Sequence, residues 1–395
     1  MEKKKKNRPP LYNKGYRNEI VKSLLTTGLL TRNTMKIMEG EYRMYLRVSQ
    51  KLCKERIAVQ IKNVVKGIAI NEFDAHYEEY ISCYPTGTYK YYKEYGEYNR
   101  QKVISSSTEK KEISKIVKAA KDSEVYNLMG MSEIRTYPED KYEVEELKKV
   151  EKAIYYTGRE IKSAIGYEAG VMKDKTLLNT RMNGLLITSQ EIYPIYHIDK
   201  GIIKWRNVGE EVIKRKIGLY LTNQLEEYRN GVSMVQIDKC ILIGINDAPF
   251  HQLVENKGTQ EYMHLDKTYA KYYALPYCRE SIKMLNIMCR PDWENEMLEL
   301  LIPERDRMEM GKVESRYVDG QNDDYASLLF CIPDLKKLRQ FKVLAQAEND
   351  STKFMVYCFT HQAEYVKKEI GEYARISHLP IEKYINRLEH KKEMN

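Results

Sequence analysis

The segment YRNEIVKSLLTTGLLTRNTMKIMEG, residues 16–40, predicts two successive helices near the start of the chain. Apolar residues recur at helical spacing from Ile20 to Leu25, and Gly28 is suited to end the first helix. Thr31 is a good N-cap for a second, shorter helix that reaches Met38, because its hydroxyl can accept a bond from an unsatisfied backbone N–H of the first turn. We therefore expect a pair of helices joined by a short connection.

The residues that follow continue the helical pattern and then change it. Helical spacing extends over Tyr42–Lys51 and again over Cys53–Lys66, whereas residues 68–98 alternate as strands do and contain turn signals. Helices followed by a β-hairpin are typical of a winged helix-turn-helix, in which the helix before the hairpin enters the DNA major groove. We expect residues 1–100 to form a basic tail and a winged helix-turn-helix DNA-binding domain.

The rest of the chain predicts a mixed α/β body, so the fold class expected is α+β or α/β. A charged helical connector is expected over residues 101–157, a small α/β subdomain over 158–230 and a second α/β subdomain over 231–395. Short apolar strands alternate with helices there, which favours a parallel or mixed sheet covered by helices. The sheet expected is either Rossmann-like or like that of a restriction nuclease whose catalytic site has degenerated.

Charge is concentrated at the start of the chain. Residues 1–70 contain 17 Lys and Arg but 5 Asp and Glu, whereas the whole chain has a net charge of +9. The remaining residues are therefore slightly acidic. Positive charge gathered on a small module speeds association with phosphates, so the pattern indicates double-stranded DNA as the partner of the N-terminal domain.

The predicted DNA-binding residues share polar or basic side chains and lie in three segments. Arg, Asn and Gln can pair with base edges, while Lys neutralises phosphate. The segments are the expected reading helix (Arg56, Gln60, Lys62, Asn63 and Lys66), the expected hairpin (Lys90 and Lys93) and the N-terminal tail (Lys3, Lys4, Lys5, Lys6 and Arg8).

Several other classes of function are disfavoured. The chain has no phosphate-binding G-x-x-x-x-G-K-[ST], no G-x-G-x-x-G after a strand, and neither H-E-x-x-H nor G-x-S-x-G. The seven cysteines occur singly, without the paired spacing of a zinc site. No apolar run approaches the roughly 20 residues of a membrane span. We expect a cytoplasmic protein without a cofactor, a metal or an enzymatic activity.

Two alternatives remain open. A divergent Mg²⁺ nuclease could use Glu160, Glu191 and Asp199, with Lys200 beside them, although residues 181–185 hold no carboxylate where a first metal ligand is expected. The winged helix could instead serve as a protein-interaction module or an inhibitor. We expect the C-terminal body to bind a protein partner or to mediate self-association. A homodimer would suit paired half-sites on DNA.

The chain also resembles a family. Its N-terminal half is similar to the winged-helix region of replication-relaxation-type proteins of Gram-positive plasmids and integrative conjugative elements, and its C-terminal half to uncharacterised proteins of the same elements. The stretches that carry the resemblance are Asn18–Ile20, Leu24-Leu25, Leu30-Thr31, Tyr92–Gly96, Arg159–Lys162, Arg181–Gly184, Ile195–His197, Ile203–Trp205, Leu329–Arg339 and Val356–Phe359.

The resemblance implies an accessory or regulatory role in the replication, transfer or transcriptional control of a mobile genetic element, exerted through DNA binding. It supplies no catalytic residues. Some members of the family carry a Pro-Asp pair where this chain has Asn183-Gly184, so the resemblance implies that any ancestral metal site is lost here.

Overall fold

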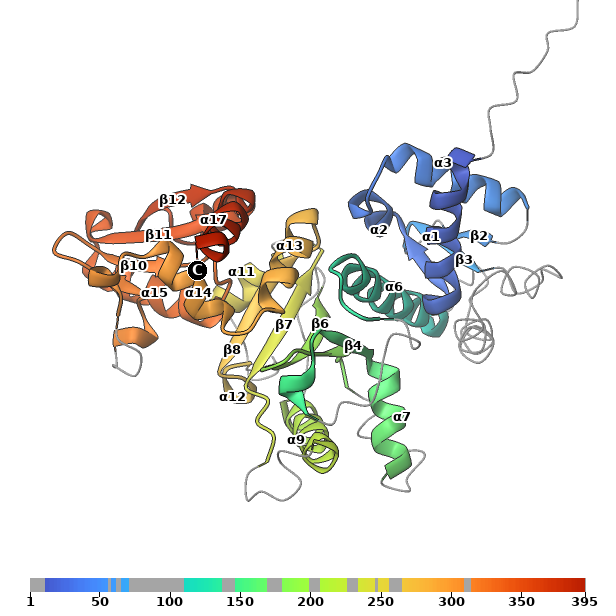
Figure 1. Cartoon of the computed structure of the whole chain (residues 1–395), viewed down its shortest axis with the longest axis horizontal. Coiled ribbons are helices and arrows are strands. Elements are labelled where there is room, and N and C mark those ends of the chain that lie inside the picture. Colours follow the sequence, from blue (N-terminus) through green and yellow to red (C-terminus); the bar gives the residue numbers. More distant parts are fainter. Residues whose placement is uncertain are drawn as a thin grey trace, which may run out of the picture. The chain divides into compact units, whose positions relative to one another are not determined.

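The structure is a computed structural model that describes residues 11–55, 58–61, 65–70, 110–136, 146–168, 180–198, 207–225, 234–245, 248–255, 265–308 and 314–394. The chain divides into an N-terminal unit, Met1–Tyr142, and a C-terminal unit, Glu143–Asn395. Helices and three sheets make up the described residues, which confirms a mixed α and β fold (Figure 1). Among these residues, no helix is both long and apolar enough to cross a membrane.

The N-terminal unit places helices around a small antiparallel sheet. The sheet has three strands in the order β1-β3-β2, and both of its pairings are antiparallel (Figure 1). The elements are α1 (Leu11–Thr27), β1 (Leu29–Thr31), α2 (Arg32–Ile37), α3 (Tyr42–Lys54), β2 (Ala58–Ile61), β3 (Gly67–Ile70) and α6 (Lys110–Met131).

The two predicted helix signals around residue 28 are confirmed. Gly28 has a positive φ of 77°, a conformation that glycine adopts without steric cost, and its N–H donates to the carbonyl of Leu24 at 2.8 Å. The hydroxyl of Thr31 accepts from the N–H of Thr34 and so caps α2. The chain therefore leaves α1, forms the short strand β1 and enters α2 within a few residues.

One core holds α1, α2, α3 and the hairpin together. It is formed by buried residues of α1, β1, α2, α3, β2 and β3 and of the residue after α2: Ile20, Val21, Leu24, Leu30, Met35, Met38, Tyr45, Val48, Leu52, Ala58 and Ile68. Helix α6 packs on β1, where Ile116 and Ala120 lie against Leu29. The buried carboxylate of Glu124 accepts from the Thr31 hydroxyl at 2.8 Å and from the Asn33 amide at 3.2 Å. Helix α6 thus belongs to the N-terminal unit as part of its fold.

The predicted helix over Cys53–Lys66 is wrong. Helix α3 ends at Lys54, and Ala58–Ile61 pairs antiparallel with Gly67–Ile70 as the two arms of a hairpin. The apolar residues of this stretch fit a helical period, but it is rich in Val and Ile, which lose side-chain freedom in a helix and pack well in a sheet. Strand structure therefore begins at Ala58, before the expected β-rich stretch, and residues 71–98 of that stretch lie outside the described residues.

A five-stranded mixed sheet opens the C-terminal unit. Its order is β4-β5-β6-β7-β8, with antiparallel pairs up to β6 and parallel pairs from β6 to β8. The sheet is therefore mixed and differs from the all-parallel sheet of a Rossmann fold. The elements are β4 (Ile154–Thr157), α7 (Gly158–Glu168), β5 (Gly184–Ile187), β6 (Ile192–Ile198), α9 (Asn207–Gln224), β7 (Lys239–Gly244), α11 (Ala248–Glu255), α12 (Leu265–Thr268) and β8 (Lys271–Pro276).

A second, four-stranded sheet follows in the order β12-β11-β10-β9. Strands β10, β11 and β12 are parallel, and β9 is antiparallel. The alternation of strands and helices predicted for this part is confirmed. The elements are α13 (Arg279–Met288), α14 (Trp293–Leu301), β9 (Gly320–Gln321), β10 (Ala326–Leu329), α15 (Leu335–Glu348), β11 (Phe354–Phe359), α16 (Ala363–Ile370), β12 (Arg375–Leu379) and α17 (Ile381–Met394).

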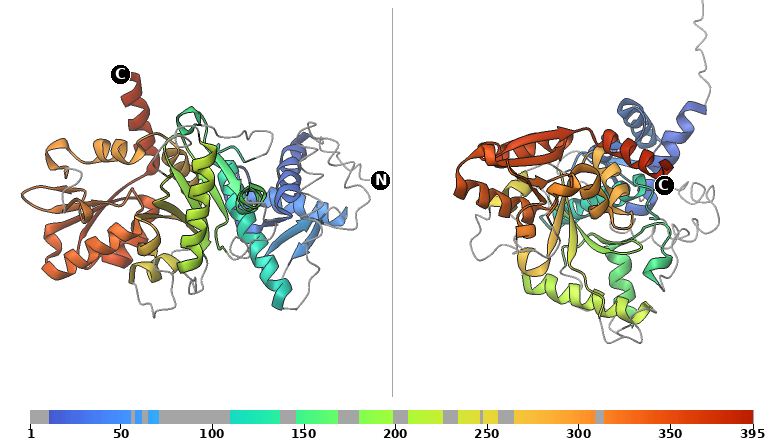
Figure 2. Two further views of the ribbon diagram at one scale, coloured as in Figure 1. Left: turned by 90° about the horizontal axis from the view of Figure 1, so that it is seen from below. Right: turned by 60° about the vertical axis from the view of Figure 1, so that its left-hand side comes forward.

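Helices cover both faces of the five-stranded sheet (Figures 1 and 2). Ile217 of α9 joins Tyr196 and Leu242 in one core cluster, which extends to the second sheet. On the other face, Trp293 of α14 donates its indole N–H to the hydroxyl of Tyr193 at 3.2 Å. Strands β5, β6 and β7 are buried along almost their whole length, as their apolar runs predict.

Candidate nucleic-acid interface

Helix α3 has one buried and one exposed face. Tyr45, Val48, Ser49 and Leu52 are buried. The exposed polar residues at spacings of four, three and four lie along the opposite side: Arg43, Arg47, Gln50 and Lys54. Since residues at these spacings share one face of a helix, α3 carries a stripe of three cationic side chains and one amide. We call these four residues the α3 basic stripe.

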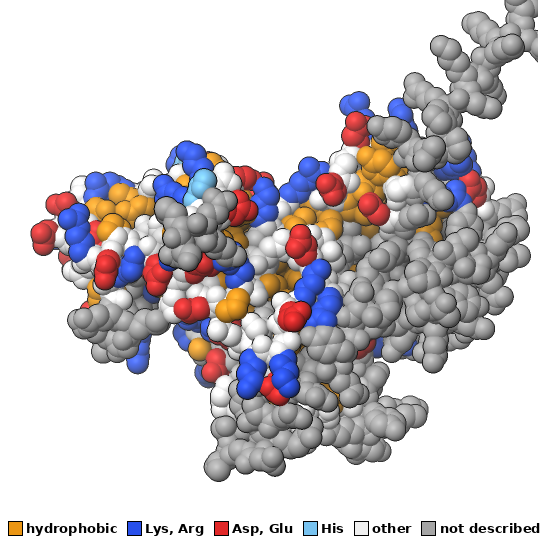
Figure 3. All heavy atoms as spheres, in the orientation of Figure 1, with side chains coloured by type: hydrophobic (Ala, Val, Ile, Leu, Met, Phe, Trp, Pro, Cys, Tyr) orange, Lys and Arg blue, Asp and Glu red, His pale blue; other side chains and the backbone are white. Residues whose placement is uncertain are grey.

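No side chain of the α3 basic stripe has a hydrogen bond or an ion pair within the described part of the chain. A cation without a protein partner keeps its whole charge available to an external anion, unlike a paired one. Figure 3 shows Lys and Arg side chains over the part of the N-terminal unit where Figure 1 labels α3. The stripe is thus a charged surface of a kind that binds phosphate.

The turn before α3 fixes the direction of the helix. Gly40 has φ +101°, and a Cβ atom built on it would lie 2.6 Å from the hydroxyl of Tyr16, so any other residue would be strained and would clash. That hydroxyl also accepts from the N–H of Glu41 at 3.2 Å.

The hydroxyl of Tyr45 bonds the carboxylate of Glu19 and, at 2.7 Å, the carbonyl of Glu39. Burial and the Glu19 carboxylate raise the pKa of Tyr45, which therefore stays a hydrogen-bond donor.

The end of α3 carries its own counter-charge. The carboxylate of Glu55 forms an ion pair with Arg17, whose Nη2 lies at 2.9 Å, and it lies 3.7 Å from Lys51 Nζ. These two cations are therefore partly neutralised, in contrast to the α3 basic stripe. Free positive charge on α3 is greatest over its first three turns.

The hairpin that follows α3 presents further polar side chains. Gln60 is exposed on β2, directly opposite Ile68 of β3, and Lys66 is exposed immediately before β3. Both predicted residues therefore lie on or beside strands and not on a helix, which corrects the expected reading helix.

The other predicted DNA-binding residues lie outside the described residues: Lys3, Lys4, Lys5, Lys6, Arg8, Arg56, Lys62, Asn63, Lys90 and Lys93. Sequence reasoning missed Arg43, Arg47, Gln50 and Lys54 as candidates. Their regular spacing is visible in the sequence, but the sequence favours the predicted helix Cys53–Lys66 as the one that reads DNA.

The residues of the nuclease alternative have structural partners where they are described. Glu160 accepts from the N–H of Thr157 at 2.6 Å, and the Thr157 hydroxyl accepts in return, so the pair caps α7. Glu191 binds Lys239 at 2.6 Å. Asp199 and Lys200 lie outside the described residues.

Asn183 lies in the segment 181–185, which contains no carboxylate, and its side chain makes a structural contact. The side-chain oxygen of Asn183 accepts from the backbone N–H of His197 at 2.7 Å and ties the start of β5 to β6. Within the described ranges, no three His, Cys, Asp or Glu residues are grouped so as to hold a metal.

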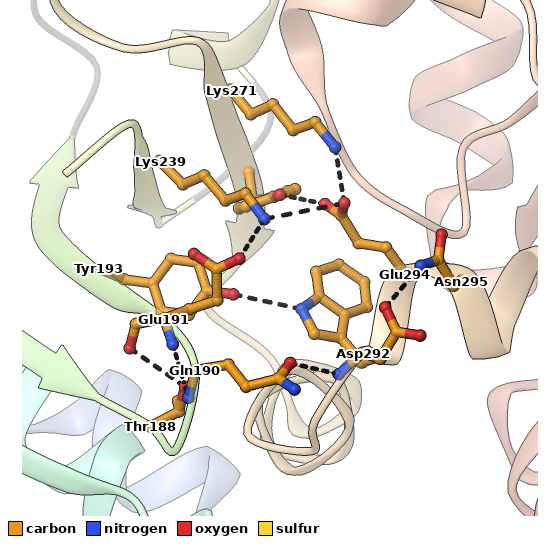
Figure 4. A network of polar contacts seen from close by, with 11 residues as sticks. Thr188, Gln190, Glu191, Tyr193, Lys239, Lys271, Asp292, Glu294 and Asn295 are labelled. Carbon is orange, nitrogen blue, oxygen red and sulfur yellow. Dashed lines mark hydrogen bonds and ion pairs between the residues drawn. The ribbon is translucent and has the colours of Figure 1, made fainter. Parts of the chain in front are cut away.

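A half-buried network of ion pairs and hydrogen bonds lies at the amino ends of β7 and β8 (Figure 4). Glu294 of α14 binds Lys271 at 2.6 Å and lies 3.9 Å from Lys239, and its other oxygen accepts from the hydroxyl of Tyr273. Burial alone would raise the pKa of Glu294, but Lys271 and Lys239 outweigh it and lower the pKa.

This network has the character of a structural element. Ligands of α/β sheets bind at the carboxyl ends of the strands, whereas this network lies at the amino ends. Lys239 and Lys271 face each other across paired strands, where like charges repel, and the carboxylate between them offsets that repulsion. The network therefore fixes α14 to the sheet.

Comparisons of the chain with protein-family models, with curated proteins and with solved structures found no match.

Proposed function

We propose that this protein binds double-stranded DNA through its N-terminal unit, with α3 in the major groove. The observation that carries the proposal is the α3 basic stripe, Arg43, Arg47, Gln50 and Lys54, which is exposed and has no described protein partner. Side chains of these kinds make the contacts to phosphates and base edges that DNA-binding helices use.

The order of elements supports a winged helix-turn-helix. Helix α1, a short strand, α2, a turn of four residues, α3 and an antiparallel hairpin follow one another, and the short strand pairs with the second arm of the hairpin. In such a module the helix before the hairpin is the one that enters the groove. That helix is α3, one element earlier than the helix expected from the sequence.

The distribution of charge agrees with this function. The excess of positive charge lies in residues 1–70, so the rest of the chain adds little attraction for a polyanion. The resemblance to replication-relaxation-type proteins extends the proposal to an accessory or regulatory role in the replication, transfer or transcriptional control of a mobile genetic element. The protein would act in the cytoplasm. In this role the C-terminal unit serves a protein partner or self-association, and the protein is not an enzyme.

Equilibrium binding of the full chain to a fluorescein-labelled 24-base-pair duplex tests the proposal. The triple variant Arg43→Gln/Arg47→Gln/Lys54→Gln should bind at least tenfold more weakly than the unsubstituted chain. A matched triple variant of exposed cations in the C-terminal unit, Arg215→Gln/Lys353→Gln/Lys368→Gln, should change affinity less than twofold. Equal losses in both triple variants, or no binding by the unsubstituted chain at low salt, would refute the proposal.

A further inference from the structure

We infer that Arg47 and Gln50 select the base sequence, by pairing with a guanine and a neighbouring adenine, while Lys54 contributes affinity without selectivity. This inference rests on the proposed DNA binding by α3. It divides the α3 basic stripe into a part that reads bases and a part that binds the backbone.

The division follows from the position of each side chain along α3. Arg47 and Gln50 occupy the middle of the helix, whereas Lys54 is its last residue. The two middle residues are separated by about 4.5 Å along the helix axis, close to the roughly 3.4 Å between successive base pairs. A helix lying along the groove therefore brings these two side chains to neighbouring base pairs.

The chemistry of the two side chains differs in a way that assigns the bases. The guanidinium of Arg47 presents two parallel N–H donors, which match O6 and N7 of guanine. The amide of Gln50 has one donor and one acceptor, which match N7 and N6 of adenine. Gln50 is also the neutral member of the stripe, so electrostatic attraction to phosphate does not explain its presence.

Charge at the end of α3 keeps Lys54 in a different role. Glu55, the residue after Lys54, is an anion, and the backbone carbonyls at a helix end add partial negative charge. Both disfavour close approach of this end to a base edge lined with acceptors. The flexible Lys54 side chain can still reach a phosphate as a point charge.

Selection from a pool of 30-base-pair duplexes with a random 12-base-pair centre tests the inference, with the full chain as the binder. The enriched duplexes should share adjacent guanine and adenine. Gln50→Met, which keeps the length of the side chain and removes its polar groups, should lower the preference for that adenine about tenfold. Arg47→Met should do the same for the guanine, and Lys54→Met should weaken binding equally for all duplexes.

The outcomes separate this inference from the function on which it rests. Salt-sensitive binding without any enriched sequence would overturn the inference and leave DNA binding intact. An enriched sequence whose preference is unchanged in Gln50→Met and Arg47→Met would also overturn it. Absence of binding to the starting pool would overturn both. Because both side chains are exposed and have no partner among the described residues, hydrogen exchange of α3 should be unchanged in the two variants, which controls for folding.

Discussion

Arg17 of α1 and Glu55, the residue after α3, form an ion pair with 2.9 Å between Arg17 Nη2 and Glu55 Oε2. Lys51 lies 3.7 Å from the other oxygen of the same carboxylate. A single acidic residue thus neutralises part of the charge on two cations beside the proposed DNA-binding helix. The ion pair between Arg17 and Glu55 joins α1 to the end of α3, and its carboxylate also lowers the positive charge that α3 offers to DNA.

Glu55→Gln should therefore increase DNA affinity. The substitution removes one negative charge beside α3 and leaves Lys51 without its counter-charge, so we expect a gain of about threefold or more at low salt. Glu364→Gln, the same charge change on α16 of the C-terminal unit, is the control and should have little effect. Fluorescence anisotropy with the labelled duplex measures both, and a weaker or unchanged affinity of Glu55→Gln would contradict the expectation.

Gly40→Ala should loosen the connection between α2 and α3. The left-handed φ and the contact of the added Cβ with Tyr16 make the substitution unfavourable by about 2 kcal/mol. Gly15→Ala is the matched control, because no atom lies within 4 Å of its added Cβ and alanine favours a helix by about 1 kcal/mol. Hydrogen exchange of α2 and α3 should be faster in Gly40→Ala and unchanged or slower in Gly15→Ala. Similar exchange in the two variants would show that the turn is not constrained as described.

Glu294→Ala should lower the stability of the C-terminal unit. It leaves Lys239 and Lys271 facing each other without their shared carboxylate. Because these side chains are half-buried, we expect a cost of about 2 kcal/mol, between that of an exposed and that of a buried pair. Glu382→Ala, which removes the exposed ion pair with Lys283, should cost less than about 1 kcal/mol. Both tryptophans of the chain lie in the C-terminal unit, so urea unfolding followed by their fluorescence measures this difference. Equal losses would assign no stabilising role to the network.

The carboxyl group of Asp334 should make stability depend on pH. Burial raises its pKa to about 6, although Lys271 and the N–H groups of Lys336 and Lys337 oppose the shift. Because the folded state holds this proton more tightly than the unfolded state, the stabilisation is present at pH 4 and is lost as the pH rises through 6.

Asp334→Asn tests this dependence, since asparagine retains an acceptor for the cap of α15 and does not ionise. Between pH 4 and pH 7 the unsubstituted protein should lose about 2 kcal/mol of stability relative to the variant. Urea unfolding at four pH values, followed by tryptophan fluorescence, gives the two curves. Parallel curves would show that Asp334 does not titrate in this range.

Local patterns were sufficient to predict most elements of the chain. The N-cap at Thr31 and the end of α1 at Gly28 each depend on neighbouring residues, and the sequence predicts both. The stretch from Ala58 to Ile61 was not, because a short run of apolar residues fits both a strand and a helix. Pairing with Gly67–Ile70 decides between them, and this pairing is a tertiary contact.

The candidate interface shows the same division. The sequence shows that basic charge is concentrated in the first part of the chain. Which helix exposes this charge depends on where α3 ends, and the sequence does not show that end. The contact between Glu124 and Thr31 joins residues 93 positions apart, and no local pattern indicates it. Long-range contacts of this kind place α6 in the N-terminal unit, and sequence periodicity carries no information on them.

The salt dependence of DNA binding tests the central claim most directly. Each cation that neutralises a phosphate contributes about 0.9 to the slope of log K against log salt concentration. If α3 binds DNA, the triple variant Arg43→Gln/Arg47→Gln/Lys54→Gln should have a slope smaller than that of the unsubstituted chain by between about 1 and 3. An identical slope in the two proteins would show that the α3 basic stripe makes no phosphate contact, and would contradict the account.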